Sequence, residues 1–224
     1  MKVIATYNIK GGVGKTATAV NLARLAAREG APTLIWDLDP QGAASYYFRI
    51  KPKIKGGGKK LIQGKRNLER SIRGTDFELL DLLPADFSYR NMDIFLEGTK
   101  KPSHQLYKLL RQFKNEYEYV FLDCPPSISL VSENIFDATT AILVPTIPTT
   151  LSLRTYTQIL QFFNKHDLDT TKLLPFFCMT DRRKKMHRTM MDSPAEYLKN
   201  LMPTAIPYDS KVEQMGIHRA PLVE

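Results

Sequence analysis

A glycine-rich loop between an apolar run and an amphipathic stretch limits this chain to few folds. The loop is Lys10–Thr16, with the sequence Lys-Gly-Gly-Val-Gly-Lys-Thr. Before it, Lys2–Tyr7 has the apolar character of a buried strand. After it, Thr16–Glu29 has apolar residues at helical spacing and ends at Gly30. Strand, glycine-rich loop, Gly-Lys-Thr and helix in this order indicate a phosphate-binding loop, whereas a glycine-rich turn without a ligand would not require the order.

Each part of the loop has a physical role in binding a triphosphate. Glycines lack a Cβ and accept positive φ, so the backbone N–H groups can point at the phosphates, aided by the positive end of the following helix. Lys15 supplies a charge to the β- and γ-phosphates, and the Thr16 hydroxyl can bind Mg²⁺. The strict pattern has glycine six positions before this lysine. The chain has Ile9 there, so the loop is a variant.

Strand-like and helix-like segments alternate along the chain, which favours parallel strands joined by helical crossovers. Helices are expected over His104–Glu116 and Leu153–His166. The expected fold is α/β, a three-layer P-loop NTPase fold with a mostly parallel central sheet flanked by helices. One domain over residues 1–224, with 43% hydrophobic residues, is long enough to bury its core. Further strands are expected at Thr33–Trp36, Glu78–Leu83, Tyr119–Leu122, Ala141–Pro145 and Leu173–Met179.

Acidic residues follow two of the expected strands. Asp37 and Asp39 come after Thr33–Trp36, and Asp123 comes after Tyr119–Leu122. In parallel sheets the ligand lies at the carboxyl ends of the strands. A carboxylate there can hold Mg²⁺ or its water ligands, and a second can orient the water that attacks a γ-phosphate. Helix capping or turn formation would explain either acidic motif alone, but not three strand-end motifs in one chain.

Charge and composition narrow the class of protein. The 224 residues carry a formal net charge of +9, which favours polyanionic partners such as nucleic acid or anionic lipid. No segment approaches the ~20 apolar residues of a membrane span, and the N-terminus lacks the pattern of a signal peptide. Cys124 and Cys178 have no metal-ligand spacing and lie in apolar contexts, so we expect reduced core thiols in a cytoplasmic protein.

Residues 49–73 interrupt the alternation with a dense run of positive charge. Glu69 is the only acidic residue in the run, and Gly56–Gly58 lies inside it. We expect a mobile basic insert that leads into a short helix. A solvated loop and a dedicated binding element would both explain this composition. The basic residues are Arg49, Lys51, Lys53, Lys55, Lys59, Lys60, Lys65, Arg66, Arg70 and Arg73.

Four motifs match the pattern of one known family. They are Lys10–Thr16, Asp37–Gly42 (Asp-Leu-Asp-Pro-Gln-Gly), Asp123–Ser127 (Asp-Cys-Pro-Pro-Ser) and Thr180–Arg183 (Thr-Asp-Arg-Arg). Through these motifs the chain resembles the ParA/MinD family of deviant Walker A ATPases over nearly its whole length. It is more similar to the ParA (Soj) branch, which partitions chromosomes and plasmids.

The resemblance implies an ATP hydrolase that uses Mg²⁺ and forms a sandwich dimer with two nucleotides at its interface. Lys10 matches the signature lysine, which crosses to the partner's phosphates, and Lys15 matches the ordinary phosphate lysine. Asp39 matches the residue that positions the hydrolytic water. Thr16, Asp37 and Asp123 match the residues around Mg²⁺. The implied nucleotide-binding residues are Lys10, Gly11, Gly12, Val13, Gly14, Lys15, Thr16, Ala17 and, around the adenine, Met179, Asp181 and Pro207.

The resemblance also implies partners. Dimers of the ParA type bind double-stranded DNA without sequence preference, largely through phosphate contacts. A ParB-like protein or cargo adaptor stimulates hydrolysis, so we expect such a partner and a place over the nucleoid. Charged loops can also be merely solvated, which is the alternative for the run at Asp181–Arg188. The expected DNA contacts are Arg154, Arg182, Arg183, Lys184, Lys185, Arg188, Lys211 and Arg219.

Three other classes remain as alternatives. A membrane-associated ATPase of the MinD type would need a C-terminal amphipathic helix, which His218–Glu224 does not provide. A further C-terminal helix of the ParA pattern is also expected to be missing. A cluster-carrying relative would need cysteines placed to bridge subunits, which Cys124 and Cys178 do not match. A nucleotide-sensing scaffold without turnover would not need Asp39 beside an intact loop.

Overall fold

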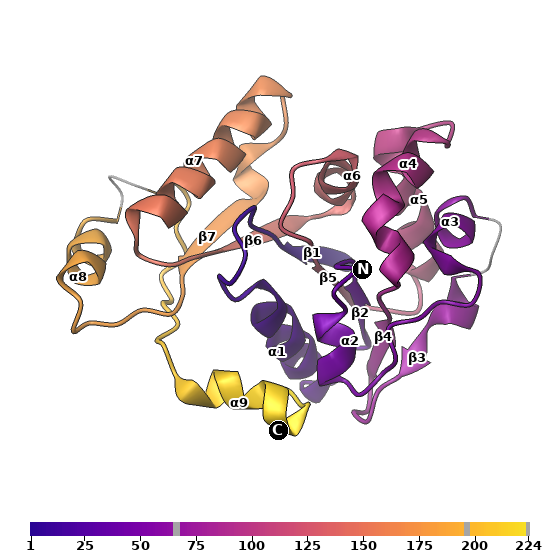
Figure 1. Ribbon diagram of the computed structural model, residues 1–224, viewed down its shortest axis with the longest axis horizontal. Helices are drawn as coiled ribbons and strands as arrows, with labels where there is room; N and C mark the ends of the chain where they lie inside the picture. Colours follow the sequence, from indigo (N-terminus) through magenta and orange to yellow (C-terminus); the bar gives the residue numbers. More distant parts are fainter. Residues whose placement is uncertain (65–67, 195–197, 223–224) are drawn as a thin grey trace.

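A central sheet organises the molecule (Figure 1). The computed structural model describes residues 1–64, 68–194 and 198–222. Within them the sheet has seven strands in the order β3-β4-β2-β5-β1-β6-β7. All neighbours pair in parallel except β3, which is antiparallel to β4. The strands are β1 (Lys2–Thr6), β2 (Thr33–Asp37), β3 (Arg73–Gly74), β4 (Leu80–Leu83), β5 (Tyr119–Asp123), β6 (Ala141–Thr146) and β7 (Leu173–Phe177).

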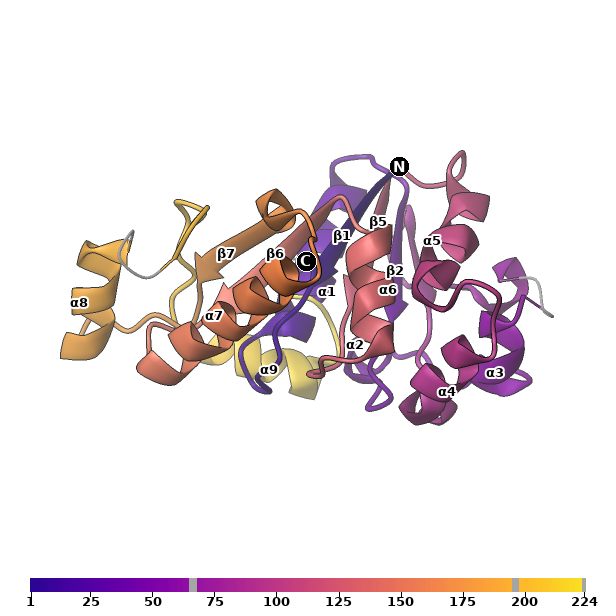
Figure 2. The same cartoon turned by 90° about the horizontal axis from the view of Figure 1, so that it is seen from above.

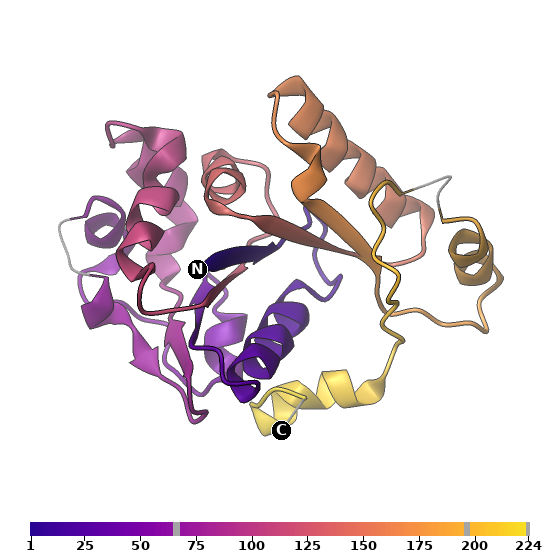
Figure 3. The ribbon, with the colours of Figure 1, turned by 180° about the vertical axis from the view of Figure 1, so that it is seen from behind.

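Helices cover both faces of the sheet, as expected for strands that are buried on each side. The alternation along β2 separates two cores: Leu34 and Trp36 pack in the larger one, and Ile35 packs in the other. Figure 3 shows the two helical layers on either side of the strands. The layer against Ile35 contains α1 (Lys15–Arg28), α2 (Ala43–Tyr47) and α9 (Ser210–His218).

The opposite layer is larger, and one more helix lies beyond the β7 edge of the sheet. These elements surround the larger core, which includes Phe113, Tyr156 and Met190. The layer contains α3 (Gly57–Ile62), α4 (Met92–Glu97), α5 (Gln105–Leu110), α6 (Leu130–Ala138) and α7 (Thr150–Lys165), and α8 (Lys185–Asp192) lies at the edge. The short 3₁₀ turns are η1 (Glu69–Ser71), η2 (Phe87–Asn91), η3 (Pro102–His104), η4 (Arg111–Phe113) and η5 (Thr170–Lys172).

The three-layer α/β fold with a mostly parallel sheet is therefore confirmed, with differences at element ends. The strand expected from Glu78 begins two residues later, because Leu79 has a φ of 59° and the Leu80 amide closes a turn on the Phe77 carbonyl. The last strand ends at Phe177, before Met179 turns with a φ of 51°. The helix expected over His104–Glu116 is α5 followed by the 3₁₀ turn η4.

The basic segment differs from the expected mobile loop. Gly57 and Gly58 are the first two residues of α3, and Ile54, Leu61 and Ile62 are buried against the rest of the layer. Apolar side chains between the lysines therefore pack this segment against the core. The sequence contains these apolar residues, but the glycine triplet favoured the interpretation as a mobile loop. Lys65 and Arg66 lie outside the described residues.

Two further expectations concern composition. The thiols of Cys124 and Cys178 are free and buried, as predicted. Within residues 1–64, 68–194 and 198–222, every helix is too short or too polar to cross a bilayer.

Candidate nucleotide-binding site

The phosphate-binding loop lies at the carboxyl end of β1, on the side of the sheet where the parallel strands end (Figure 2). Gly12 and Gly14 have φ values of 69° and 93°, and Gly14 is the residue from which α1 begins. A Cβ built on Gly11 or Gly12 would have no atom within 4 Å. The loop therefore presents open backbone at a helix N-terminus, which fits a phosphate group.

The side chains of Asn8 and Cys178 hold the phosphate-binding loop in place, a role that the sequence did not indicate. The amide of Asn8 donates to the Pro145 carbonyl at 3.0 Å, while its oxygen accepts from the Lys10 backbone N–H at 2.9 Å. The Cys178 thiol donates to the Val13 carbonyl at 3.0 Å. Asn8 is fully buried, so these bonds are shielded from water and hold the start of the loop on β6.

Two lysines meet at this loop. The Lys15 ammonium donates to the Lys10 carbonyl at 3.0 Å, so it lies across the loop rather than in solvent. Burial lowers the pKa of Lys15, and the carboxylate of Asp123 opposes this. The Lys10 ammonium lies 3.4 Å from the hydroxyl of Ser152, a fully buried residue in the first turn of α7. Sequence reasoning did not identify Ser152, because a serine in a helix carries no signal of its own.

Asp37 and Asp123 end adjacent strands and are partners in the register of β2 and β5. Both are fully buried. One oxygen of Asp37 accepts hydrogen bonds from the Ser45 N–H and hydroxyl, each at 2.7 Å, and its other oxygen has no partner among the described residues. Neither oxygen of Asp123 has a partner in the same part of the chain. Ser45, on α2, is a further residue that sequence reasoning missed.

The two carboxyl groups are electrostatically strained. Burial raises the pKa of Asp37 to about 6, against the two hydrogen bonds from Ser45. Burial also raises the pKa of Asp123 well above its usual value, and the neighbouring Asp37 adds to the rise. The Thr16 hydroxyl and Lys15 act in the opposite direction on Asp123, although the Thr16 hydroxyl completes no hydrogen bond of ordinary geometry with it. A cation at this position would relieve both carboxylates.

The oxygen atoms of Asp37, Asp123 and Thr16 fit Mg²⁺ better than they fit a metal ion that needs a full set of protein ligands. Among the described residues, no three His, Cys, Asp or Glu side chains are grouped to bind a metal ion. Mg²⁺ usually takes one or two carboxylates, several waters and substrate phosphates, rather than a full set of protein ligands. The orphaned oxygens of Asp123 and Asp37, with the Thr16 hydroxyl at the start of α1, supply such a partial set.

Asp39 differs from the two buried carboxylates. It lies two residues beyond Asp37, is partly exposed, and accepts a hydrogen bond from the Gln41 backbone N–H at 2.9 Å. Burial lowers the pKa of Lys15 and the negative charge of Asp39 acts to raise it, so this carboxylate lies near the loop. An accessible carboxylate here can accept a hydrogen bond from water, as a residue that orients an attacking water must do.

Two of the three residues expected around the adenine line a pocket of about 490 Å³, and Met179 is not part of its lining. Asp181 and Pro207 both line it, and Thr180 forms a β-bridge with Pro207. Met179 connects this region to the loop, because a Cβ on Gly14 would lie 3.6 Å from the Met179 methyl group. The structure therefore brings the loop and the expected base-binding segments together, although they are about 170 residues apart in sequence. The pocket is lined by Thr180, Asp181, Arg182, Arg183, Met191, Ala205, Pro207 and Tyr208.

The expected DNA contacts do not form one patch. Arg182, Arg183, Lys184, Lys185 and Arg188 are exposed on α8 and the turn before it. Arg154 is exposed on α7 and Lys211 on α9.

Two of the expected arginines contact other side chains, and a third, Arg188, donates to the Arg182 carbonyl at 2.9 Å. The Arg183 guanidinium pairs with both oxygens of Asp181, at 2.9 and 3.0 Å, and this pair lowers the Asp181 pKa to about 2. The Arg219 guanidinium donates to the Tyr46 carbonyl at 3.2 Å and lies 4.5 Å from the centre of the Tyr46 ring. DNA would have to compete with these contacts for all three side chains.

The chain is similar to known proteins in sequence and in fold. The model of a family described as "AAA domain" matches residues 1–174. The sporulation initiation inhibitor protein Soj of Bacillus subtilis is 29% identical over 99% of this chain and 90% of its own length. The chromosome-partitioning ATPase Soj of Treponema pallidum is 27% identical over 99% of this chain and 88% of its own.

A solved structure shares the fold. Cobyrinic acid a,c-diamide synthase from Mycobacterium smegmatis, with bound ADP and magnesium, superposes with a TM-score of 0.83. The alignment covers 98% of this chain and 91% of that one at 23% identity. At that identity the likeness concerns the fold alone.

Proposed function

The chain belongs to the AAA domain family, in the Soj/ParA branch of the ParA/MinD ATPases, and on this premise we propose that it is an ATP-dependent switch that positions or segregates DNA or a large cellular cargo. It binds Mg·ATP, forms a sandwich dimer, binds DNA without sequence preference and hydrolyses ATP slowly. A ParB-like or cargo-adaptor partner, together with DNA, stimulates the hydrolysis. It acts in the cytoplasm, over the nucleoid.

The observation that carries the ATPase proposal is the pair Asp37 and Asp123 beside Lys15. Two buried carboxylates with orphaned oxygens lie at one strand edge, and a buried lysine crosses the adjoining loop. When bound, Mg²⁺ would neutralise these carboxylates and part of the charge on the phosphates. The arrangement is costly without such ligands, since buried charges need partners.

The chain's own residues divide the work on the γ-phosphate. The open backbone of Gly11–Gly14 accepts the phosphates, and Lys15 exchanges the Lys10 carbonyl for a phosphate oxygen. Asp39 orients the attacking water from its partly exposed position. Ala17, in the first turn of α1, adds a backbone N–H near the phosphates, and the pocket around Asp181 and Pro207 receives the adenine.

Lys10 makes turnover conditional on dimerisation. Within the described part of the chain, the side-chain hydroxyl of Ser152, at 3.4 Å, is the one hydrogen-bond partner of its ammonium. A cation supplied in trans to a phosphate oxyanion stabilises the transition state only when two subunits meet. Basic side chains on α7, α8 and α9 then bind DNA phosphates, and the net charge of +9 favours this.

The assay that tests the function is ATP turnover by wild type and Lys10→Ala with Mg²⁺ and duplex DNA. The proposal expects measurable turnover by wild type, and loss of turnover with residual ATP binding in the variant. Lys114 is an exposed lysine directly after η4, and Lys114→Ala is the matched control, which should turn over like wild type. A monomeric Lys10→Ala protein with wild-type turnover would contradict the assigned role.

A further inference from the structure

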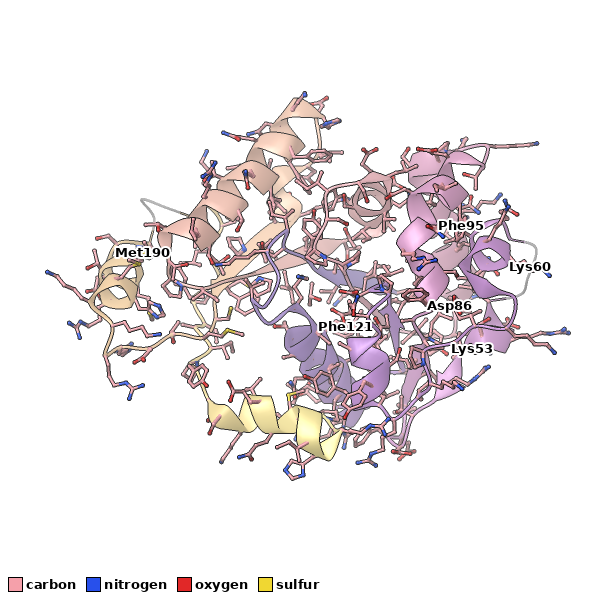
Figure 4. The ribbon with its side chains drawn as sticks, in the orientation of Figure 1. Lys53, Lys60, Asp86, Phe95, Phe121 and Met190 are labelled. Atoms are coloured by element: carbon pink, nitrogen blue, oxygen red, sulfur yellow. The ribbon has the colours of Figure 1, made fainter. Side chains whose placement is uncertain are left out.

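Four lysines form an exposed group at the end of the molecule that carries α3. They are Lys51, Lys53, Lys59 and Lys60, here called the basic platform. Figure 4 shows Lys60 at the outer edge of the molecule, with Asp86 on its inner side. The ATPase site does not use these side chains.

The backbone of the platform is fixed to the layer beneath it. The Ile54 N–H donates to the buried carboxylate of Asp86 at 2.8 Å, and the Gly58 N–H donates to the Ser88 hydroxyl at 2.8 Å. A Cβ on Gly58 would lie only 2.7 Å from the Tyr89 ring, so α3 packs against η2 at the closest approach that glycine permits. The four lysines therefore project from a rigid support and not from a floppy loop.

The charge of the platform has no internal counterpart. Between residues 49 and 63 the chain has six basic residues and no acidic one. Within the described part of the chain, none of the four lysines forms an ion pair or side-chain hydrogen bond, whereas neighbouring Arg49 pairs with Asp76. Asp86 and Asp93, on the adjoining elements, are committed to backbone N–H groups of Ile54 and Val131. The four lysines therefore carry positive charge that no carboxylate in the described structure pairs with, and such charge attracts polyanions.

The apolar side of the segment decides between two polyanions. Binding to a lipid surface by a short basic segment needs exposed apolar side chains that enter the bilayer. Here Ile54, Leu61 and Ile62 face the core and are at most 3% exposed, and no large apolar side chain of residues 49–64 is exposed. Residues 49–64 themselves offer charge alone, which is what the phosphate backbone of DNA requires, and the exposed apolar side chains nearby, Phe87 and Ile94, belong to η2 and α4.

Position separates the platform from the other basic cluster. The elements α3 and α8 lie at opposite ends of the molecule in Figures 1 and 3. The platform also lies against the Asp37–Gly42 motif, because a Cβ on Gly42 would lie 2.8 Å from Pro52. A ligand on the platform is therefore bound next to the segment that carries Asp37 and Asp39.

We propose that the basic platform is a second, independent contact surface for the phosphate backbone of duplex DNA, rigidly joined to the Asp37–Gly42 motif. The inference rests on the proposed function only in taking DNA as a ligand. It assigns to Lys51, Lys53, Lys59 and Lys60 a role that the contacts on α7, α8 and α9 do not cover.

The test is a salt titration of binding to two duplexes of unrelated sequence, with ATP and Mg²⁺ present. The platform variant is Lys51→Gln/Lys53→Gln/Lys59→Gln/Lys60→Gln, which lowers the net charge from +9 to +5. The matched control changes four exposed lysines elsewhere to glutamine, with the same effect on net charge. These control residues are Lys2, Lys108, Lys114 and Lys199, none of which lies on α3, α7, α8 or α9.

The platform variant should bind both duplexes roughly tenfold or more weakly near 0.1 M salt, with a log–log salt slope lower by about 2 to 4, since each lost phosphate contact removes about 0.9. The control should change the slope by less than 1. Equal slopes for the two variants would overturn the proposal. So would loss of binding to phosphatidylserine vesicles with unchanged DNA binding.

Two further measurements keep this result separate from the proposed function. Melting temperature and ATP-dependent size, measured on both variants, show whether the fold and the dimer are intact. If the platform variant dimerises with ATP but has a lower salt slope of DNA binding than wild type, the result supports the platform as a DNA contact surface. If wild type never dimerises with ATP while the platform variant still has a lower salt slope of DNA binding than wild type, the result counts against the dimerisation switch and still supports the platform.

Discussion

The carboxylates of Asp37 and Asp123 lie opposite each other, as register partners at the carboxyl ends of β2 and β5. Both are buried, and three of their four oxygens have no hydrogen-bond partner among the described residues. Two buried like charges with few donors destabilise the folded state. Ligands bind at the carboxyl ends of neighbouring parallel strands, so a cation that binds there with its ligand would offset the charge of the two carboxylates.

Asp123→Asn should therefore stabilise the ligand-free protein while removing Mg²⁺-dependent turnover. Asp123 has a pKa in the folded protein well above its usual 3.8, so the folded chain holds the ionised form less well than the unfolded chain does. The free energy of unfolding contributed by Asp123 is thus highest at low pH and falls as pH rises from about 4 through the raised pKa. Asp123→Asn removes the charge and therefore restores the unfolding free energy that wild type loses at higher pH.

Thermal unfolding without nucleotide or Mg²⁺ checks this at pH 5 and pH 8. The variant should melt several degrees above wild type at pH 8, and the gap should narrow at pH 5. Asp181→Asn is the control and should show no such gain, because hydrogen bonds with Arg183 lower rather than raise the pKa of Asp181. An Asp123→Asn protein that melts below wild type at pH 8 would refute the strained-pair interpretation.

Ser45→Ala should weaken the site through Asp37 without touching the ligand. The Ser45 hydroxyl donates to Asp37 at 2.7 Å and accepts from the Ala85 N–H at 3.0 Å, in a fully buried position. Losing these bonds leaves a buried carboxylate oxygen and a buried N–H poorly satisfied, at a cost of about 1–3 kcal/mol in unfolding free energy. Chemical denaturation measures the loss.

The readout specific to the site is the Mg²⁺ concentration needed for half-maximal turnover, which should rise in Ser45→Ala. Asp37→Asn/Ser45→Ala should lose less stability than the two single variants summed, because the pair acts as one unit. Strict additivity would show that Ser45 acts elsewhere.

Arg182 and Arg183 should contribute unequally to DNA binding. Arg183 is paired with both oxygens of Asp181, whereas the Arg182 side chain has no ion pair in the described structure. DNA must displace Asp181 before Arg183 can reach a phosphate. Arg182→Ala should lower the log–log salt slope by about 1, and Arg183→Ala should lower it by less. Equal changes in slope for the two variants would mean that breaking the Asp181–Arg183 ion pair costs no binding free energy. Lys199→Ala serves as the control.

Local patterns in the sequence predicted the fold and the acidic edge of the site. Strands with continuous apolar residues, such as Tyr119–Leu122, and the loop before α1 were identified because buried parallel strands and phosphate loops have short-range signatures. The same rule placed Asp37 and Asp123 at one edge. The adenine segments around Asp181 and Pro207 came from the family resemblance, and the structure brings them together as a pocket.

The remaining features depend on contacts between distant residues. Asn8, Ser45 and Ser152 act through partners 8 to 142 positions away, and serine or asparagine at such places has no periodic signal. The glycine triplet at 56–58 reads locally as a flexible loop, yet Gly58 is needed for close packing of α3 on Tyr89. Short helices such as α2, α4 and α9 are fixed by tertiary packing rather than by propensity.

The central claim is that nucleotide drives a dimer in which Lys10 completes the partner's site. Its most direct test is the mass in solution of Asp39→Ala with ATP and Mg²⁺, with ADP and without nucleotide, beside the double variant Lys10→Ala/Asp39→Ala. Because the proposal assigns the orientation of the attacking water to Asp39, hydrolysis should be blocked in Asp39→Ala. The account therefore predicts a dimer of Asp39→Ala with ATP alone and a monomer for the double variant in every condition. An Asp39→Ala protein that stays monomeric with ATP, or a double variant that dimerises like it, would contradict the account.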